Sequence, residues 1–209
     1  MLKDEILDFL NKIDQHLVKH VDTRSGKFEF KIIGKSALLL AGLIDSIGTV
    51  DIDSLTIEGA VVSEKDAEVI KVLQNEFGRA NITVHGHYIE FVSSSIVFLP
   101  RKAEWVGLGV SSKNITVQYL EPHCNIASKL FSAFATPPRK KDKQDIVSAL
   151  DQKLVDFQKI LNIADKIFDE YSMDARNTRF KNVSHYIRND LMAKFGDAIL
   201  KYEHDEEIS

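Results

Sequence analysis

Cysteine is almost absent from the sequence, and its scarcity excludes several kinds of site. The single residue, Cys124, rules out an internal disulfide and any zinc site that needs several cysteine ligands. The start of the chain lacks the basic segment and apolar run of a signal peptide, because Asp4 and Glu5 stand there. We therefore expect a reducing, cytoplasmic setting.

Long apolar runs and an excess of positive charge are also missing. The longest apolar stretch, residues 37–44, falls far short of the roughly 20 residues that cross a bilayer, so we expect no membrane partner. With 27 Lys and Arg against 31 Asp and Glu, the formal net charge is −4. Nucleic acid would therefore have to bind a local basic patch, because the chain as a whole provides no positive field.

The chain of 209 residues is otherwise ordinary for a globular protein, with 44% hydrophobic and 28% charged residues. The spacing of its apolar residues predicts helices at 3–19, 37–41 and 63–77 and strands at 28–33 and 49–57. The residues expected to face the core from the second strand are Val50, Ile52 and Leu55.

The pattern of apolar residues changes near Pro122. Between 81 and 120, short apolar runs separated by turn residues predict an antiparallel set of strands, and helical spacing follows. This order of elements predicts an α+β fold with a helical C-terminal part. The proline-marked segment 136–141 is the plausible hinge, so we expect a first domain at 1–135 and a helical region at 136–209.

Two neighbouring segments, 34–36 and 49–53, carry the most informative pattern. Asp51 and Asp53 alternate on a predicted strand, where side chains at i and i+2 point the same way, about 7 Å apart. Two such carboxylates can bridge hard divalent ions, and Mg²⁺ prefers carboxylates together with substrate phosphates. A Gly-Lys-Ser turn before a helix offers amides, a hydroxyl and the positive end of a dipole to a triphosphate.

Simpler explanations exist for each segment alone. An Asp-x-Asp pair on a strand is more often a solvated face, and a Gly-x-Ser turn is usually only a turn. Their combination in one short stretch of chain favours a metal–nucleotide site. A P-loop is excluded, because that motif needs a glycine five positions before the Gly-Lys-Ser, and Glu29 occupies this position.

In these segments the chain resembles the nucleotidyltransferase superfamily that includes polymerase beta, and more closely the AbiEii/AbiGii group of nucleotidyltransferase-like toxins. That group combines a Gly-x-Ser/Thr-Ala-Leu segment, a Thr-x-Asp-Ile-Asp strand, a helix with Pro, Lys-Leu and Ala, and an Arg-x-Lys-Asp-x-x-Asp-Ile segment. The sequence has similar motifs in the same order between residues 30 and 150. They are Gly34-Lys35-Ser36-Ala37-Leu38, Thr49-Val50-Asp51-Ile52-Asp53, Pro122 to Ala133 with Lys129-Leu130, and Arg139 to Ile146.

The resemblance implies a nucleotidyltransferase-like mixed sheet flanked by helices. It also implies Mg²⁺-dependent transfer of a nucleotidyl group from a nucleoside triphosphate to an RNA, such as tRNA, or to a protein. Asp51 and Asp53 would hold Mg²⁺. The superfamily expects a third metal carboxylate on a neighbouring strand, for which Glu90 is the candidate. A toxin of this kind would also have an antitoxin protein as its partner.

The remaining motifs are assigned by the same resemblance. Ser36 and the turn it forms with Gly34 and Lys35 would hold the β and γ phosphates. Lys129 would neutralise phosphate charge, and Asp142 would lie at the catalytic cleft.

Each of these residues also has a structural explanation. Lys129 could be a solvated helix lysine, Asp142 an N-cap for a helix that starts at Lys143, and Asp145 a first-turn acid suited to the helix dipole. Glu90 could be an ordinary exposed strand glutamate. The sequence also departs from the toxins at Ile47, where they have arginine, and in serines after Val92, where many relatives have acids.

Other candidate sites are weaker. His85 and His87 flank a turn and could be metal ligands, although a polar hairpin is the simpler explanation. Arg179 and His185 have the spacing of an arginine–histidine ribonuclease pair, which chance also produces in charged helices. Cys124 lies near a helix start but has no evident base, so we expect a buried structural cysteine.

Two functions remain open from the sequence. The first is a Mg²⁺-dependent nucleotidyltransferase, which could be the toxin of a toxin–antitoxin pair. The second is a catalytically inactive module of the same fold that binds a nucleotide or a partner protein. The basic run Arg139-Lys140-Lys141, extended by Arg176, Arg179, Lys181 and Arg188, could contact RNA phosphates or simply be a solvated loop.

Overall fold

The computed structural model describes most of the chain. The described ranges are 1–20, 27–44, 48–56, 63–81, 86–94, 97–109, 112–134, 138–152, 154–172 and 188–204. The chain divides into two compact units. We call Met1–Ser93 with Trp105–Leu120 the sheet unit, and Ser94–Glu104 with Glu121–Ser209 the helical unit.

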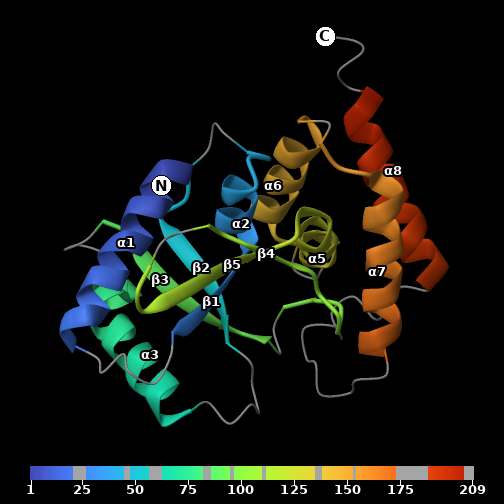
Figure 1. Ribbon diagram of the computed structural model, residues 1–209. Helices are drawn as coiled ribbons and strands as arrows, with labels where there is room; N and C mark the ends of the chain where they lie inside the picture. The colour runs from blue at the N-terminus through green and yellow to red at the C-terminus, as the bar shows by residue number, and fades with distance from the viewer. Residues whose placement is uncertain are drawn as a thin grey trace. The chain divides into compact units, whose positions relative to one another are not determined.

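The sheet unit contains a five-stranded mixed sheet with strand order β3-β2-β1-β5-β4 (Figure 1). Pairs β1–β5 and β2–β3 are parallel, whereas β1–β2 and β4–β5 are antiparallel. The elements are α1 (Lys3–His20), β1 (Phe28–Ile33), α2 (Gly34–Leu40), β2 (Asp51–Thr56), α3 (Glu64–Phe77), the short 3-10 helix η2 (Arg79–Asn81), β3 (Tyr88–Ser93), β4 (Trp105–Gly107) and β5 (Ile115–Leu120).

The predicted antiparallel set between 81 and 120 is wrong for the described strands, except for β4 with β5. Helix α3 connects β2 to β3, and a connection through a helix lets the two strands run parallel. Strand β5 pairs with β1, far back in the chain. The spacing of apolar runs carries no information about these non-local pairings.

One face of the sheet is apolar, and the other combines polar residues with the buried Ile33 and Leu120. Phe30 and Ile32 of β1 and Ile52 of β2 are fully buried, and Phe9 of α1 packs edge-on against Phe77 of α3. Because side chains alternate along a strand, the residues between the buried ones face the opposite side. That side carries the candidate site.

Of the three residues at β2 that were expected to face the core, only Ile52 does so. Val50 precedes the strand and is 53% exposed, so it does not anchor the core. Leu55 is half-buried, and strand alternation puts it on the same face as Asp53.

Several helix boundaries follow the local sequence. Helix α1 and strand β1 match the predicted 3–19 and 28–33 closely. Helix α3 begins after Ser63, whose side chain accepts the N–H of Asp66 at 3.0 Å, as N-cap residues do. Helix α2 starts at Gly34 and not at the predicted Ala37, because Gly34 adopts a left-handed φ of 68° that leads directly from strand to helix.

The helical unit consists of α5 (Pro122–Phe134), α6 (Lys140–Leu150), α7 (Phe157–Ser172) and α8 (Arg188–His204). Helix α5 is buried along nearly its whole length and contacts both α6 and α7. The Arg188 guanidinium on α8 bridges Asp165 and Asp169 of α7. The predicted α+β fold with a helical C-terminal part is confirmed. Among the described residues, no helix combines the length and apolar character needed to cross a membrane.

Candidate metal and nucleotide site

Three carboxylates meet on the polar face of the sheet. Asp53 on β2 lies directly opposite Glu90 on the parallel strand β3, and Asp51 precedes Asp53 by two residues on the same face. One oxygen from each of the three lies within 4.8 Å of the others. Asp51 and Asp53 are half-buried and Glu90 is exposed. The structure thus brings together the three residues proposed from the sequence as metal ligands, which we call the acidic cluster.

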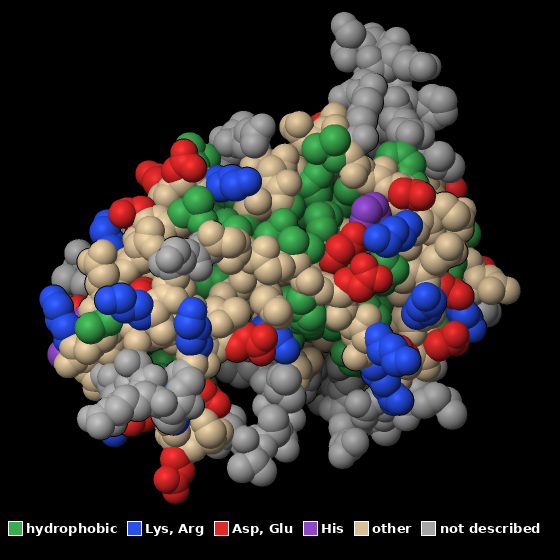
Figure 2. All heavy atoms as spheres, viewed as in Figure 1, with side chains coloured by type: hydrophobic (Ala, Val, Ile, Leu, Met, Phe, Trp, Pro, Cys, Tyr) green, Lys and Arg blue, Asp and Glu red, His purple; other side chains and the backbone are tan. Residues whose placement is uncertain are grey.

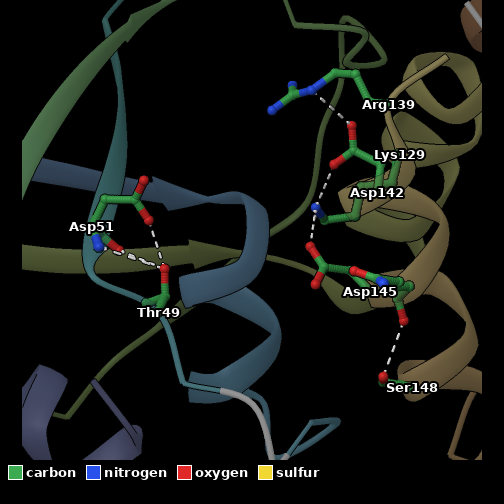
Figure 3. Close-up of polar contacts among 8 residues, drawn as sticks. Thr49, Asp51, Lys129, Arg139, Asp142, Asp145 and Ser148 are labelled. Atoms are coloured by element: carbon green, nitrogen blue, oxygen red, sulfur yellow. Dashed lines mark hydrogen bonds and ion pairs between the residues drawn. The ribbon is translucent and has the colours of Figure 1, made fainter.

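Two hydroxyl groups orient the carboxylate of Asp51. The Thr49 hydroxyl donates to Asp51 Oδ1 at 2.6 Å (Figure 3), and the Tyr88 hydroxyl donates to Oδ2 at 3.3 Å. Burial, together with the negative charge of Asp51, raises the pKa of Tyr88, so the phenol stays protonated as a donor. Sequence analysis missed Tyr88. Its position two residues before Glu90 was the available signal, since i and i+2 share a face.

Helix α2 begins directly against the acidic cluster. A Cβ atom on Gly34 would lie 2.8 Å from Asp53 Oδ2, so a larger residue would have to displace this carboxylate, and the positive φ of 68° also favours glycine. The buried Ser36 hydroxyl donates to the main-chain oxygen of Asp51 at 2.7 Å and so joins α2 to β2. Lys35 is buried as well.

The acidic cluster has the chemistry of a hard-cation site. Its ligand atoms are all carboxylate oxygens, which suit Mg²⁺, Mn²⁺ or Ca²⁺ better than the softer metals that favour thiolates. A divalent cation would also offset the repulsion among three neighbouring negative charges. Hydrogen bonds to Asp51 from Thr49 and Tyr88 resemble the outer partners that position metal ligands. The cluster could therefore hold a metal ion.

In the helical unit, Lys129 on α5 lies between two carboxylates of α6. Its Nζ donates to Asp142 Oδ1 at 2.9 Å and to Asp145 Oδ2 at 2.8 Å (Figure 3), and all three side chains are buried. Burial by itself would lower the pKa of Lys129, but the two carboxylate charges and their hydrogen bonds outweigh it and raise the pKa. The solvated-lysine explanation is therefore wrong.

The N-cap explanation for Asp142 is also wrong. Helix α6 begins at Lys140 with Arg139 as its N-cap residue, so Asp142 lies inside the first turn. Its Oδ2 is buried and accepts no hydrogen bond from the described residues, although Arg139 Nε lies 3.3 Å away as an ion pair. All three residues of the basic run, Arg139, Lys140 and Lys141, are exposed.

A second polar network in the helical unit was missed by sequence analysis. Glu121 accepts hydrogen bonds from Lys159 at 2.9 Å and from the main-chain N–H of Cys124 at 3.0 Å. His123 Nε2 accepts the N–H of Asp156, so Nδ1 carries the hydrogen and donates to Glu121. Cys124 is buried, as predicted, and burial raises the pKa of its thiol to about 11.

Several residues named in the sequence analysis lie outside the described ranges, and His87 has a structural contact. His87 makes an edge contact with the Phe9 ring. The residues at 47, 85, 176, 179, 181 and 185, and part of the hinge at 136–137, lie outside the described ranges.

Comparison with known proteins identifies a family for the chain. The family model of a nucleotidyltransferase of unknown function (DUF6036) matches residues 8–191, a span that includes the acidic cluster, Lys129 and Asp142. Comparison with curated proteins gives no match, and neither does comparison with solved structures. The family model covers most of the chain, and the protein therefore belongs to this nucleotidyltransferase family.

Proposed function

We propose that the protein is an active Mg²⁺-dependent nucleotidyltransferase, similar to the AbiEii/AbiGii toxins. It joins an acceptor hydroxyl to the α-phosphorus of a nucleoside triphosphate and releases pyrophosphate. The acidic cluster carries this proposal, because three converging carboxylates beside a glycine-started helix suit a cation and its phosphates.

Each residue of the sheet unit has a distinct task in the proposed site. Asp51, Asp53 and Glu90 would hold Mg²⁺, which when bound polarises the α-phosphate and activates the acceptor hydroxyl. Thr49 and Tyr88 keep the Asp51 carboxylate in one orientation. Gly34, Lys35 and Ser36 are proposed to contact the β and γ phosphates, and the proximity of Gly34 to Asp53 supports this assignment.

Lys129 is proposed to neutralise phosphate charge. Asp142 is proposed to act in the reaction. The buried Oδ2 atom of Asp142 forms an ion pair with Arg139 but accepts no hydrogen bond from the described residues, so it can still accept one. The Oδ2 atom of Asp142 therefore supports a role beyond packing.

The proposed acceptor is an RNA such as tRNA, with a protein acceptor as the second possibility. On the face shown in Figure 2, acidic and basic side chains are interspersed, so a phosphate backbone would need a local basic site. The exposed Lys140 and Lys141 on the first turn of α6 provide one. A toxin role, with a cognate antitoxin, belongs to the same proposal. So does the division into a first domain at 1–135 and a helical region at 136–209.

An inactive nucleotide- or partner-binding module is the alternative. The observation in its favour is that Lys129 already donates to two buried carboxylates, so its charge is offset without a phosphate.

Transfer of radiolabel from each α-labelled nucleoside triphosphate to total tRNA or to protein distinguishes the two functions. We expect labelled product with Mg²⁺ and none with the Asp53→Asn variant. Nucleotide binding by calorimetry without any product would favour the inactive module. No nucleotide binding at all would contradict the enzyme and leave only a module that binds a partner protein.

A further inference from the structure

Trp105 lies on the same transverse row of the sheet as the acidic cluster. Glu90 pairs with Asp53, and Asp53 pairs with Ile33. Since Ile32 pairs with Tyr119, the next residues, Ile33 and Leu120, are level with each other. Leu120 in turn pairs with Trp105. Residues paired in this way share a face of the sheet. Strands β2 and β4 are three strand spacings apart, so the backbones of Asp53 and Trp105 are separated by about 14 Å.

The neighbouring row places three further residues beside Trp105. Lys31 pairs with Gln118, and Gln118 pairs with Gly107. Lys31 Nζ lies 5.5 Å from the centre of the Trp105 ring, which confirms that the two side chains are on the same side. We call Trp105, Gly107, Lys31 and Gln118 the Trp105 shelf.

The Trp105 shelf is accessible and has room for a ligand. Trp105, Lys31 and Gln118 are half-buried, and Gly107 is exposed. A Cβ atom added to Gly107 would meet no described atom within 4 Å. The ion pair of Lys31 with Glu29, at 3.4 Å, is at the surface, where such pairs are weak and easily exchanged.

The chemistry of the shelf fits a nucleotide better than a simple anion or an apolar group. An indole face stacks on any nucleobase, the Gln118 amide can both donate to and accept from a base edge, and the Lys31 ammonium suits a phosphate.

We propose that the Trp105 shelf binds the nucleobase of the nucleoside triphosphate whose phosphates lie at the acidic cluster. The base stacks on the Trp105 ring above Gly107, and Gln118 contacts its edge. Lys31 leaves both Glu29 and the face of the Trp105 ring to pair with a phosphate. This inference rests on the proposed function, because it assumes that a triphosphate binds at the acidic cluster.

Trp105 is the only tryptophan of the chain, so its fluorescence reports on the shelf directly. The wild type is titrated with Mg²⁺ and each of the four nucleoside triphosphates, and with Mg²⁺ and inorganic tripolyphosphate as the ligand without a base. We expect quenching by at least one nucleotide and little change with tripolyphosphate. Equal changes with both ligands, or no change with a nucleotide that calorimetry shows to bind, would overturn the proposal.

Variants test whether the shelf itself provides the affinity. Trp105→Ala should weaken nucleotide binding about 5- to 150-fold in calorimetry, the range that follows from the loss of one stacked base, whereas Trp105→Phe should retain most of it. Gly107→Leu should fill the shelf and weaken binding without disturbing the fold. Val106→Ala is the matched control, because Val106 lies on the same strand and alternation directs it to the opposite face.

The outcomes separate the two proposals. Binding that requires Asp53 but is unchanged in Trp105→Ala and Gly107→Leu would overturn the shelf and leave the metal site intact. Absence of any Mg²⁺-dependent nucleotide binding in the wild type would overturn both.

Discussion

The carboxylate of Asp53 occupies the space that a side chain on Gly34 would need. A Cβ atom there would lie 2.8 Å from Asp53 Oδ2, and the φ of Gly34 is 68°. Glycine at this position thus lets the start of α2 contact β2, the strand that carries Asp51 and Asp53.

Gly34→Ala should therefore affect both stability and ligand binding. We expect a loss of about 1–2 kcal/mol of unfolding free energy from the left-handed backbone. Mg²⁺–nucleotide affinity should fall about 10- to 100-fold, as when a group that positions a metal ligand is changed. Thermal unfolding and calorimetry measure the two effects. Gly42→Ala is the control, since φ is 74° there and an added Cβ meets no described atom within 4 Å; it should cost stability alone.

Removing one carboxylate of the acidic cluster should abolish stabilisation by Mg²⁺. At 100 times its dissociation constant, a bound ion stabilises the folded state by about 2.7 kcal/mol, and chelation should reverse the resulting rise in Tm. Glu90→Gln should unfold at the same or a slightly higher temperature without metal, because repulsion among the carboxylates is reduced. Glu29→Gln, on strand β1 and outside the acidic cluster, should respond to Mg²⁺ like the wild type. A full Mg²⁺ response in Glu90→Gln would remove Glu90 from the site.

Lys129→Met should destabilise the helical unit strongly. It leaves Asp142 and Asp145 buried without their shared cation, and breaking a buried pair in this way costs about 3–5 kcal/mol. Adding Asp145→Asn should recover part of the loss. Denaturant unfolding measures both, and a small effect of Lys129→Met would mean that the network is not held together by charge.

The same network predicts a dependence of stability on alkaline pH. The folded-state pKa of Lys129 is raised above its ordinary value of 10.5. Its contribution is therefore complete below about 10.5 and is lost as the pH rises from there through the folded-state pKa. The difference in unfolding free energy between wild type and Lys129→Met should shrink over that window. A constant difference would contradict the raised pKa.

Cys124 should react slowly with thiol reagents in the folded protein. With a pKa of about 11 against an ordinary 9.0, its thiolate is about 100-fold scarcer at pH 8, and burial also limits access. Alkylation followed by mass spectrometry should show modification mainly after denaturant is added. Rapid modification in native buffer would show that the start of α5 opens readily.

Exposed lysines of α6 should contribute to RNA binding if RNA is the acceptor. Lys140→Ala and Lys141→Ala should each reduce the slope of log affinity against log salt by about one for every phosphate that the lysine neutralises. Arg139 is left unchanged because it pairs with Asp142. Lys12→Ala, an exposed lysine of α1, is the control and should keep the wild-type slope. Absence of tRNA binding by the wild type at low salt would point to a protein acceptor.

Local sequence was sufficient for several elements because their signals are local. The apolar spacing of α1, the side-chain cap of Ser63 on α3 and the alternation of Asp51 with Asp53 act within a few residues of chain. The same logic failed at Val50, since alternation alone does not reveal where a strand begins.

The sequence by itself determined the α+β class and the alternation of the two carboxylates on β2. Only the tertiary structure decided that Glu90 joins those carboxylates, because the parallel pairing of β3 with β2 is a non-local contact. It also decided that Lys129 is buried between Asp142 and Asp145, and that Trp105 shares a row with Asp53. Burial and cross-strand register depend on packing between distant segments, and the spacing of residues along the chain does not contain that information.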